Sequence, residues 1–276
     1  MSAAPQILER VTRVTPLGIR FWDDVTSSAI SAPLSVTGYF PSRPDRVFTA
    51  ILNHANVYLF YGLPGMRAVE YGAGDTAFWN AQTSPSPFEV EALDSSGQFL
   101  PAHFTALVPF RGVFELPIAS PLLGLPGVPL YSGPARAVPS GMAAIRLELY
   151  DAVSGGAAAW ARVEAVASPL APPARGMSDA QGRVTLLFPY PEPIDSGTLS
   201  PPNTGSLPLQ QQVWPVDIAA WYSPATPGPD IPDLSAFFAQ RPAALWADSG
   251  RSQPFSRTSL HYGRETGQVL FTTPAS

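Results

Sequence analysis

The sequence predicts an all-β protein of two tandem β-sandwich domains with one short C-terminal helix. At roughly 150 residues a domain, a chain of 276 residues predicts two domains. The chain contains 33 prolines, about twice the usual share, and proline suits turns, edge strands and extended connections better than helices. Hydrophobic residues make up 45% and charged residues 13%, so there is ample apolar surface for a packed β-structure.

A turn motif that occurs twice supports the two-domain prediction. FWDDVTSSA at 21–29 and LYDAVSGGA at 149–157 match in residue type when one is placed over the other. In each copy two apolar or aromatic residues lead into Asp23 or Asp151, and small residues follow. We therefore expect the same strand, turn and return strand in both halves of the chain.

The first domain is predicted to span residues 17–115, after an extended N-terminal arm of residues 1–16. Apolar alternation predicts strands in LGIRFWDD, APLSVTGYF and RVFTAIL. Asn53 and Asn56 tolerate left-handed backbone, so ILNHANVYLFY is expected to form a hairpin. A second hairpin is expected around DSSGQ, between FEVEAL and FLPAHFTALV. Residues 72–87 show no periodicity and are predicted to form a long surface loop.

Residues 116–141 are predicted to be a proline-rich apolar linker, followed by a second domain over residues 142–276. The segment AAIRLELYDAVSGGAAAWARVEAV predicts two strands about a small-residue turn. Period-two alternation places Ile145, Leu147 and Leu149 on the buried face of the first of these strands.

A helix is predicted near residues 231–240. Asp230 is a suitable N-cap and Pro242 ends the pattern. The last segment, TSLHYGRETGQVLFT, is predicted to form a closing hairpin around GRETG.

Several short motifs of the second half follow one another in a recognisable order. They are Asp151 with Gly155 and Gly156, then ARVEA, the turn from Asp179 to Gly182 ahead of RVTLLF, and VWPVDIAAWY. This order resembles a carboxypeptidase-regulatory-like or transthyretin-like domain. The first half is similar in FWDDVTSSA and NHANVYLFYGLPG, although it has asparagines where that family has Asp-x-x-Gly. The resemblance implies an Ig-like or transthyretin-like β-sandwich in each half, and it implies fold more than function.

The whole chain also resembles uncharacterised proteins encoded beside phage-tail-like contractile injection systems. The segments that carry this resemblance are FYGLPGMRAVEYGAGDTAFW, PFEVEALDSSGQFLPAHF and ARGMSDAQGRVTLLFPYPEP. It implies a non-enzymatic structural or assembly component of such a particle, whose partners are the other protein subunits.

The composition and the N-terminus restrict the location and the partners. MSAAPQILERVTRV lacks the apolar core of a secretory signal, so we expect cytoplasmic synthesis followed by association with the particle. Residues 116–135 are uncharged but hold five prolines and three glycines, which argues against a membrane-spanning helix. The net charge is −5 and the arginines are scattered, so no nucleic-acid partner is expected.

No catalytic residue, cofactor or metal ligand is predicted. The three histidines, His54, His103 and His261, lie at no metal-ligand spacing from another His, Asp or Glu. Ser178 is in a predicted turn and not in a nucleophile elbow. A hydrolase would require one of the histidines to reach a serine and an acid in the fold. Calcium at loop aspartates is a further alternative without EF-hand spacing, with the candidates Asp94, Asp179, Asp217 and Asp230.

The interaction candidates are exposed aromatic and apolar residues with nearby arginines. Trp79 and Phe78 lie in the predicted loop. An exposed aromatic ring there would contact a sugar or a protein, whereas a ring folded back on the loop would only fill it, and the folded-back ring is favoured. An alternative function is therefore a carbohydrate- or receptor-binding module of the fibre or adhesin type. The linker supplies an apolar patch with two possible rim arginines: Leu122, Leu123, Leu125 and Leu130, with Arg111 and Arg136.

Overall fold

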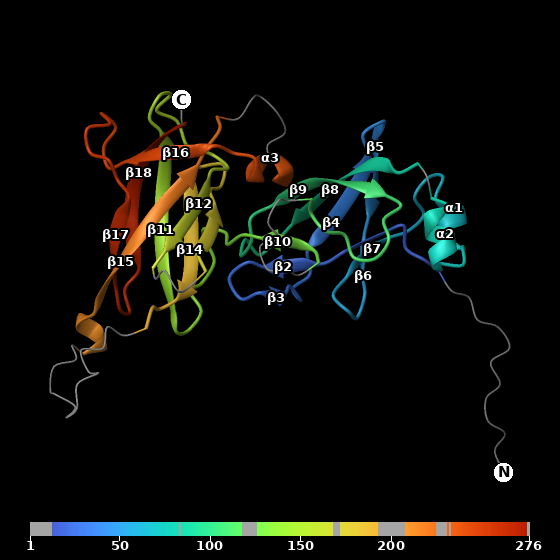
Figure 1. Cartoon of the computed structure of the whole chain (residues 1–276), viewed down its shortest axis with the longest axis horizontal. Helices are drawn as coiled ribbons and strands as arrows, with labels where there is room; N and C mark the ends of the chain where they lie inside the picture. The colour runs from blue at the N-terminus through green and yellow to red at the C-terminus, as the bar shows by residue number, and fades with distance from the viewer. Residues whose placement is uncertain are drawn as a thin grey trace, which may run out of the picture.

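The structure, a computed structural model, is mostly β, with 46% strand and 7% helix. This confirms the all-β prediction. Figure 1 shows two lobes side by side along the long axis, with helix α3 between them. We call residues 13–140 the first lobe, and residues 142–274 apart from α3 the second lobe. The residues described are 13–82, 84–117, 126–167, 172–192, 208–224, 231 and 233–274.

The first lobe contains three small sheets. Their strand orders are β1-β7-β6, β10-β2-β3 and β5-β4-β8-β9. The elements are β1 (Leu17–Ile19), β2 (Phe21–Asp23), β3 (Ser28–Ala29), β4 (Ser35–Phe40), β5 (Arg43–Thr49), β6 (Ile51–Leu52), β7 (Tyr58–Phe60), α1 (Arg67–Glu70), α2 (Thr76–Asn80), β8 (Ser86–Leu93), β9 (Ala102–Val108) and β10 (Val128–Leu130).

The second lobe is one eight-stranded sheet that is nearly closed and barrel-like. Its order is β13-β12-β15-β16-β18-β11-β14, and β17 pairs with β15 beside this path. The elements are β11 (Met142–Asp151), β12 (Arg162–Val166), β13 (Ala174–Met177), β14 (Arg183–Pro189), η1 (Leu209–Gln211), β15 (Val213–Trp221), α3 (Leu234–Phe238), β16 (Pro242–Trp246), β17 (Arg257–His261) and β18 (Thr266–Pro274).

The two lobes repeat the same strand arrangement. β4 lies between β5 and β8 with β9 beyond, just as β12 lies between β13 and β15 with β17 beyond. Leu17 of β1 pairs with Phe60 of β7, and Ile145 of β11 pairs with Leu186 of β14. β10 runs parallel to β2, as β18 runs parallel to β11. The second lobe differs by the insertion of α3 and β16 between β15 and β17.

The turn motif that occurs twice in the sequence forms the same turn twice. The side chains of Asp23 and Asp151 each accept a hydrogen bond from the backbone N–H two residues on, at 3.0 Å and 2.8 Å. Their backbone carbonyls accept from the N–H of Ser27 and Gly155, which have φ of 53° and 74°. The side-chain oxygen replaces a backbone partner at the reversal, which is why aspartate is placed there.

A second pair of turns is also equivalent, although the sequences differ. Asn53 Oδ1 accepts from the N–H groups two and four residues on, and so does Asp179 Oδ1. Three residues on, Asn56 and Gly182 have φ of 54° and 79°. Asn-x-x-Asn therefore forms the turn that Asp-x-x-Gly forms in the second lobe, since asparagine tolerates left-handed backbone.

The hydrophobic cores of the two lobes differ in where their residues come from. The second core uses residues between 143 and 270 of its own lobe. The first core combines residues 17–131 with Met177, Leu234 and Phe237 from the second half of the chain. The second half therefore completes the core of the first lobe.

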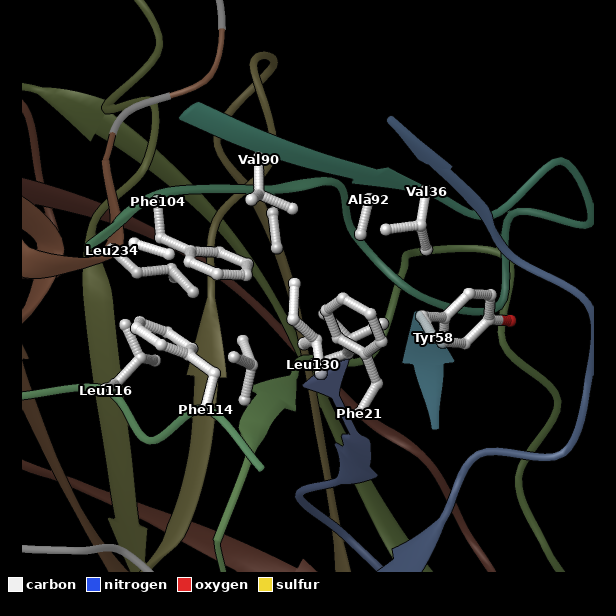
Figure 2. Close-up of a cluster of buried hydrophobic side chains, with 14 of the residues drawn as sticks. Phe21, Val36, Tyr58, Val90, Ala92, Phe104, Phe114, Leu116, Leu130 and Leu234 are labelled. Carbon is white, nitrogen blue, oxygen red and sulfur yellow. The ribbon is translucent and has the colours of Figure 1, made fainter. Parts of the chain in front are cut away.

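Helix α3 supplies most of this contribution. Leu234 and Phe237 are 1% and 0% exposed, and the Phe237 ring lies 5.3 Å from that of Tyr131. Figure 2 shows Leu234 next to Phe104 within the first core. Burying two large apolar side chains holds α3 on the first lobe.

The predicted helix thus forms, but it is shorter than expected. It covers Leu234–Phe238 instead of residues 231–240. Its N-cap is Asp233, whose side chain accepts from Ser235 N at 2.7 Å. Asp230, the expected cap, lies outside the described residues.

Part of the predicted linker 116–141 belongs to the first lobe, which corrects that prediction. β10 pairs with β2, and the Tyr131 carbonyl accepts from Leu100 N at 2.9 Å. Leu130 and Tyr131 are both 2% exposed. Val128, Leu130 and Tyr131 all belong to the first core, so the prolines here mark a buried strand and not a free linker.

The predicted closing hairpin is also wrong. β17 pairs with β15, and β18 pairs with β11 and β16. The two strands follow one another in sequence but take different neighbours. The same holds for β11 and β12 on either side of the Asp151 turn. Turn chemistry predicts where the chain reverses and leaves the choice of partner strand open.

A short helix replaces part of the predicted loop 72–87. α2 is capped by Asp75, whose Oδ1 accepts from Phe78 N at 2.8 Å. Its five residues are too few to show helical periodicity in the sequence. Within the described ranges, no helix combines the length and the apolar content needed to cross a bilayer.

Candidate functional site

A histidine and two carboxylates meet where α3 docks on the first lobe. Glu89 lies on β8, His103 on the adjacent β9, and Asp233 caps α3. One potential ligand atom from each lies within 4.8 Å of the others. Because strand side chains alternate between faces, Glu89 and His103 face away from the core that Phe88 and Phe104 enter. We call Glu89, His103 and Asp233 the junction triad.

Hydrogen bonds from neighbouring residues fix the two carboxylates of the junction triad. His103 Nε2 lies 3.2 Å from Glu89 Oε2. The Thr105 hydroxyl lies 3.1 Å and 3.0 Å from the two Glu89 oxygens and donates to that carboxylate. Thr105 N donates to Asp233 Oδ2 at 3.1 Å, while the other Asp233 oxygen caps the helix through Ser235 N. Thr105 on β9 thus orients both carboxylates, and the first turn of α3 also holds Asp233.

The surroundings of the triad are negatively charged. Glu91 is the cross-strand partner of His103, so three carboxylates lie near one imidazole. None of the arginines that the structure describes forms an ion pair with Glu89, Glu91 or Asp233. Burial, and then the charges of Glu91 and Glu89, raise the pKa of nearby Tyr39. A cation placed here would meet a favourable potential.

His103 itself is 9% exposed, and its Nδ1 is buried without a hydrogen-bond partner. A neutral imidazole nitrogen and carboxylate oxygens are ligands for divalent transition metals. A nucleophile pair would instead require a hydroxyl bonded to the imidazole. The Thr105 hydroxyl donates to Glu89, and no serine or threonine in the described ranges donates to His103. The geometry therefore fits cation binding better than activation of a nucleophile.

Sequence reasoning missed the junction triad because its members are far apart along the chain. No helical or loop spacing relates His103 to Asp233. The available signals were the alternation of Glu89 and Glu91 on one strand face and the aspartate ahead of a helix. The other two histidines, His54 and His261, are exposed.

A second polar cluster lies where the turn after β2 approaches β12 and β13. Arg162 and Arg175 lie 4.0 Å and 3.6 Å from Glu164. Asp24 Oδ1, the Tyr131 hydroxyl and the Nε atoms of both arginines are buried without hydrogen-bond partners. Burial raises the pKa of Asp24 to about 6, with Arg175 lowering it and Glu164 raising it further.

Arg136, predicted as a rim contact, is instead buried in the first lobe. Its two terminal nitrogens donate to Asp23 at 2.8 Å and 2.5 Å, and its guanidinium lies 4.8 Å from the centre of the Phe99 ring. Burial alone would raise the pKa of Asp23, but the hydrogen bonds and charge of Arg136 lower it. Arg136 therefore stabilises the fold and presents no rim to a partner, which corrects the prediction.

The other predicted interaction residues of the linker are only partly described. Leu130 is covered by the first core, so the expectation of an exposed side chain is wrong. Arg111 is exposed and donates to Thr76 Oγ1 at 3.3 Å. The remaining three lie outside the described residues: Leu122, Leu123 and Leu125.

Phe78 and Trp79 are both half-buried on α2. The Phe78 ring covers Gly72, where an added Cβ would lie 2.2 Å from the ring. Trp79 packs edge-on against Phe78, with ring centres 5.4 Å apart. Phe78 is therefore folded back on its own segment, and Trp79 retains part of its surface.

The aspartates considered for calcium serve other purposes. Asp94 accepts from Ser96 N and Phe99 N within its own turn. Asp217 pairs with Arg257 at 2.6 Å. Asp179 forms the turn before β14, and Asp230 lies outside the described residues.

Two consecutive strands of the first lobe lie at sheet edges. Among the described residues, β5 pairs with β4 alone and β6 with β7 alone, so each of these strands has one side without a strand partner there. Val47 and Ile51 are 57% and 62% exposed. The start of the segment 43–52 carries proline and charge, whereas 47–52 carries none. We call residues 43–52 the open edge.

No protein-family description matches the chain, and no curated protein does. Among solved structures, the chain is similar to the Bacillus anthracis TIE protein, with 8% identity and a TM-score of 0.23, over 95% of this chain and 34% of that one. It therefore spans about a third of that protein's length. Two variants of the shaft pilin spaA from Lactobacillus rhamnosus GG are similar at 9% and 7% identity, with TM-scores of 0.22 and 0.23. These matches cover 94% and 96% of this chain and 97% and 99% of the pilin. The likenesses are too weak to assign a family.

Proposed function

We propose that the protein is a non-enzymatic structural subunit of a larger protein assembly, built from two tandem Ig-like or transthyretin-like β-sandwiches. The observation that carries this proposal is the open edge. The resemblance of the whole chain to proteins encoded beside contractile injection systems makes a phage-tail-like particle the proposed assembly.

The open edge has the properties of a strand-pairing site. Unpaired backbone N–H and C=O groups on an edge strand pair readily with another chain, and soluble proteins usually protect such edges. The opposite edge of the same sheet is protected, because Asp233 forms a bridge with His103 on β9. In the second lobe the counterpart strand β13 lies against β14, since Gly176 contacts Leu186 and Val184. The proposed occupant of the open edge is therefore an extended strand from a neighbouring subunit.

The contacts between the lobes also suit a subunit of an assembly. Arg146 of the second lobe donates to the carbonyls of Pro134 and Arg136 at 2.7 Å and 3.0 Å. Gln240, two residues after α3, donates to Trp160 O and accepts from Arg162 N, which ties the end of the helix to the second lobe. Together with α3, these contacts hold the lobes in one orientation before any partner binds. Pre-organised surfaces lose less conformational entropy on association.

The experiment follows a tagged full-length chain in its native organism. Sheathed particles are purified before and after a high-salt wash, and mass spectrometry measures the ratio of this chain to the sheath protein. We expect a fixed ratio that survives the wash. If the wild-type chain is absent from the particles, the proposal is wrong.

A matched pair of variants tests the open edge. Ile51→Lys places a charge on that edge and should lower incorporation by at least about tenfold, because the charge would be buried against the partner strand. Val153→Lys makes the same change at a 75% exposed position in the second lobe and should incorporate normally. Equal melting temperatures would show that neither change acts through folding. Normal incorporation of Ile51→Lys would rule out the open edge as the contact.

A further inference from the structure

The junction triad carries an inference beyond the assembly function. We propose that Glu89, His103 and Asp233 bind one divalent transition-metal ion, with Zn²⁺ the closest match, and that this ion ties α3 to the first lobe. The site uses one nitrogen and two carboxylate ligands, contributed by β8, β9 and the N-cap of α3.

The distances within the junction triad suit a small ion. Zinc–ligand bonds of about 2.0–2.2 Å in a tetrahedral arrangement place neighbouring ligand atoms about 3.3 Å apart. His103 Nε2 and Glu89 Oε2 are 3.2 Å apart, and all three ligand atoms lie within 4.8 Å of one another.

The negative charge of the site favours a bound cation. Two carboxylates of the triad and the adjacent Glu91 have no arginine partner among the described residues. Asp23, in contrast, faces Arg136 in the same lobe. Clustered carboxylates in a partly buried place repel one another unless a positive charge lies between them.

The imidazole supplies the nitrogen ligand of the site. His103 is 9% exposed as a residue. Its Nε2 lies 3.2 Å from Glu89 Oε2 and is the nitrogen that a bound ion would take. Its Nδ1 is buried without a hydrogen-bond partner, and coordination through Nε2 leaves that nitrogen unchanged.

The supporting residues are those of a positioned metal site. Thr105 donates to both carboxylates, through its hydroxyl to Glu89 and through its N–H to Asp233. Such hydrogen bonds hold ligands in their coordinating orientation, and their loss commonly weakens metal binding by about 10–100-fold. Thr105 is thus a positioning residue for this site.

The test is a titration of the full-length, chelator-treated protein with Zn²⁺ alone. Isothermal titration calorimetry is expected to give one equivalent, and saturating Zn²⁺ is expected to raise the melting temperature. Co²⁺ is expected to give visible d–d absorption of a low-symmetry site, which Zn²⁺ then displaces. This spectroscopic readout needs no variant.

Two matched variants locate the ion. His103→Gln and His261→Gln remove the same side chain, but His261 lies exposed on β17. His103→Gln should weaken Zn²⁺ binding by more than about 100-fold, and His261→Gln should bind like the wild type. Because His103→Gln also changes a buried side chain, Glu89→Gln is a second probe. It retains an acceptor for the Thr105 hydroxyl and should also lose the Co²⁺ absorption.

The proposal is overturned if the wild-type protein shows no saturable binding below about 1 mM Zn²⁺. It is equally overturned if one equivalent binds but His103→Gln and Glu89→Gln leave its affinity unchanged. Unchanged affinity would place the ion elsewhere on the chain. Absence of binding would leave the triad as a hydrogen-bonded contact between α3 and β9.

Discussion

The two lobes have the same strand arrangement but reach stability in different ways. The second lobe fills its core with its own residues. The first lobe completes its core with residues that come from the second half, chiefly through α3. The helix belongs to the insertion that distinguishes the second lobe from the first. The comparison shows that the departure from the repeat is also what joins the two copies.

The repeated turns show the same contrast at the level of single residues. Asp23 and Asp151 form equivalent turns. Asp23 faces the guanidinium of Arg136, whereas Asp151 accepts a hydrogen bond from the neutral hydroxyl of Tyr222 at 3.3 Å. Local sequence therefore sets the turn, and contacts from distant segments set its electrostatic surroundings.

The largest expected effect comes from separating the halves of the chain. A fragment of residues 142–276 should unfold cooperatively, whereas residues 1–141 alone should lack a cooperative transition. The fragment 1–141 loses Leu234, Phe237 and Met177 from its core. Each such loss costs about 2–5 kcal/mol, and together they approach the whole stability of a domain, about 5–15 kcal/mol. Thermal melts followed by circular dichroism measure the unfolding transition of each fragment. A sharp transition in 1–141 near that of the full chain would contradict the dependence on α3.

A single substitution tests how much the first core depends on α3. Phe237→Ala should lower the free energy of unfolding by about 3–5 kcal/mol, because it opens a cavity in the first core. Phe238→Ala, on the half-buried side of the same helix, should cost clearly less. Urea denaturation followed by tryptophan fluorescence compares the two. Equal losses would mean that α3 is held by its surface and not by Phe237.

The two turn aspartates are expected to differ when their partners are removed. Arg136→Met leaves Asp23 buried and uncompensated, which should cost about 3–5 kcal/mol. Tyr222→Phe removes one neutral partner from Asp151 and should cost about 1 kcal/mol. Asp23→Asn combined with Arg136→Met should recover part of the loss, because no unpaired charge remains. A loss from Arg136→Met no greater than that from Tyr222→Phe would show that the buried ion pair adds nothing.

An effect of the opposite sign, a gain in stability, is expected at Asp24, whose counterpart in the second lobe is Ala152. The pKa of Asp24 is about 6 in the folded protein against 3.8 ordinarily. The folded state therefore binds a proton between about pH 4 and 6 that the unfolded state does not bind. That contribution to stability is complete below about pH 4 and is lost as the pH rises through 6.

Asp24→Asn should consequently stabilise the protein at pH 7, by an amount on the order of 2 kcal/mol. It should also flatten the fall in stability between pH 4 and 6. Asp45→Asn, an exposed change on β5, is the control and should alter stability by less than about 0.5 kcal/mol. Chemical denaturation across this pH range is the measurement. An unchanged slope in Asp24→Asn would assign the pH dependence to another group.

The β class, the buried face of β11 and the turns were predictable from local residue patterns. Asp23, Asp151 and Asp179 cap their turns through hydrogen bonds that span only a few residues. The local sequence is therefore enough to predict these turns. Strand pairing, the place of β10 in the first lobe and the meeting of Glu89, His103 and Asp233 were not predictable from local patterns. Those outcomes depend on contacts between segments far apart in the chain. Such contacts are selected by the total apolar area that they bury and not by any local pattern.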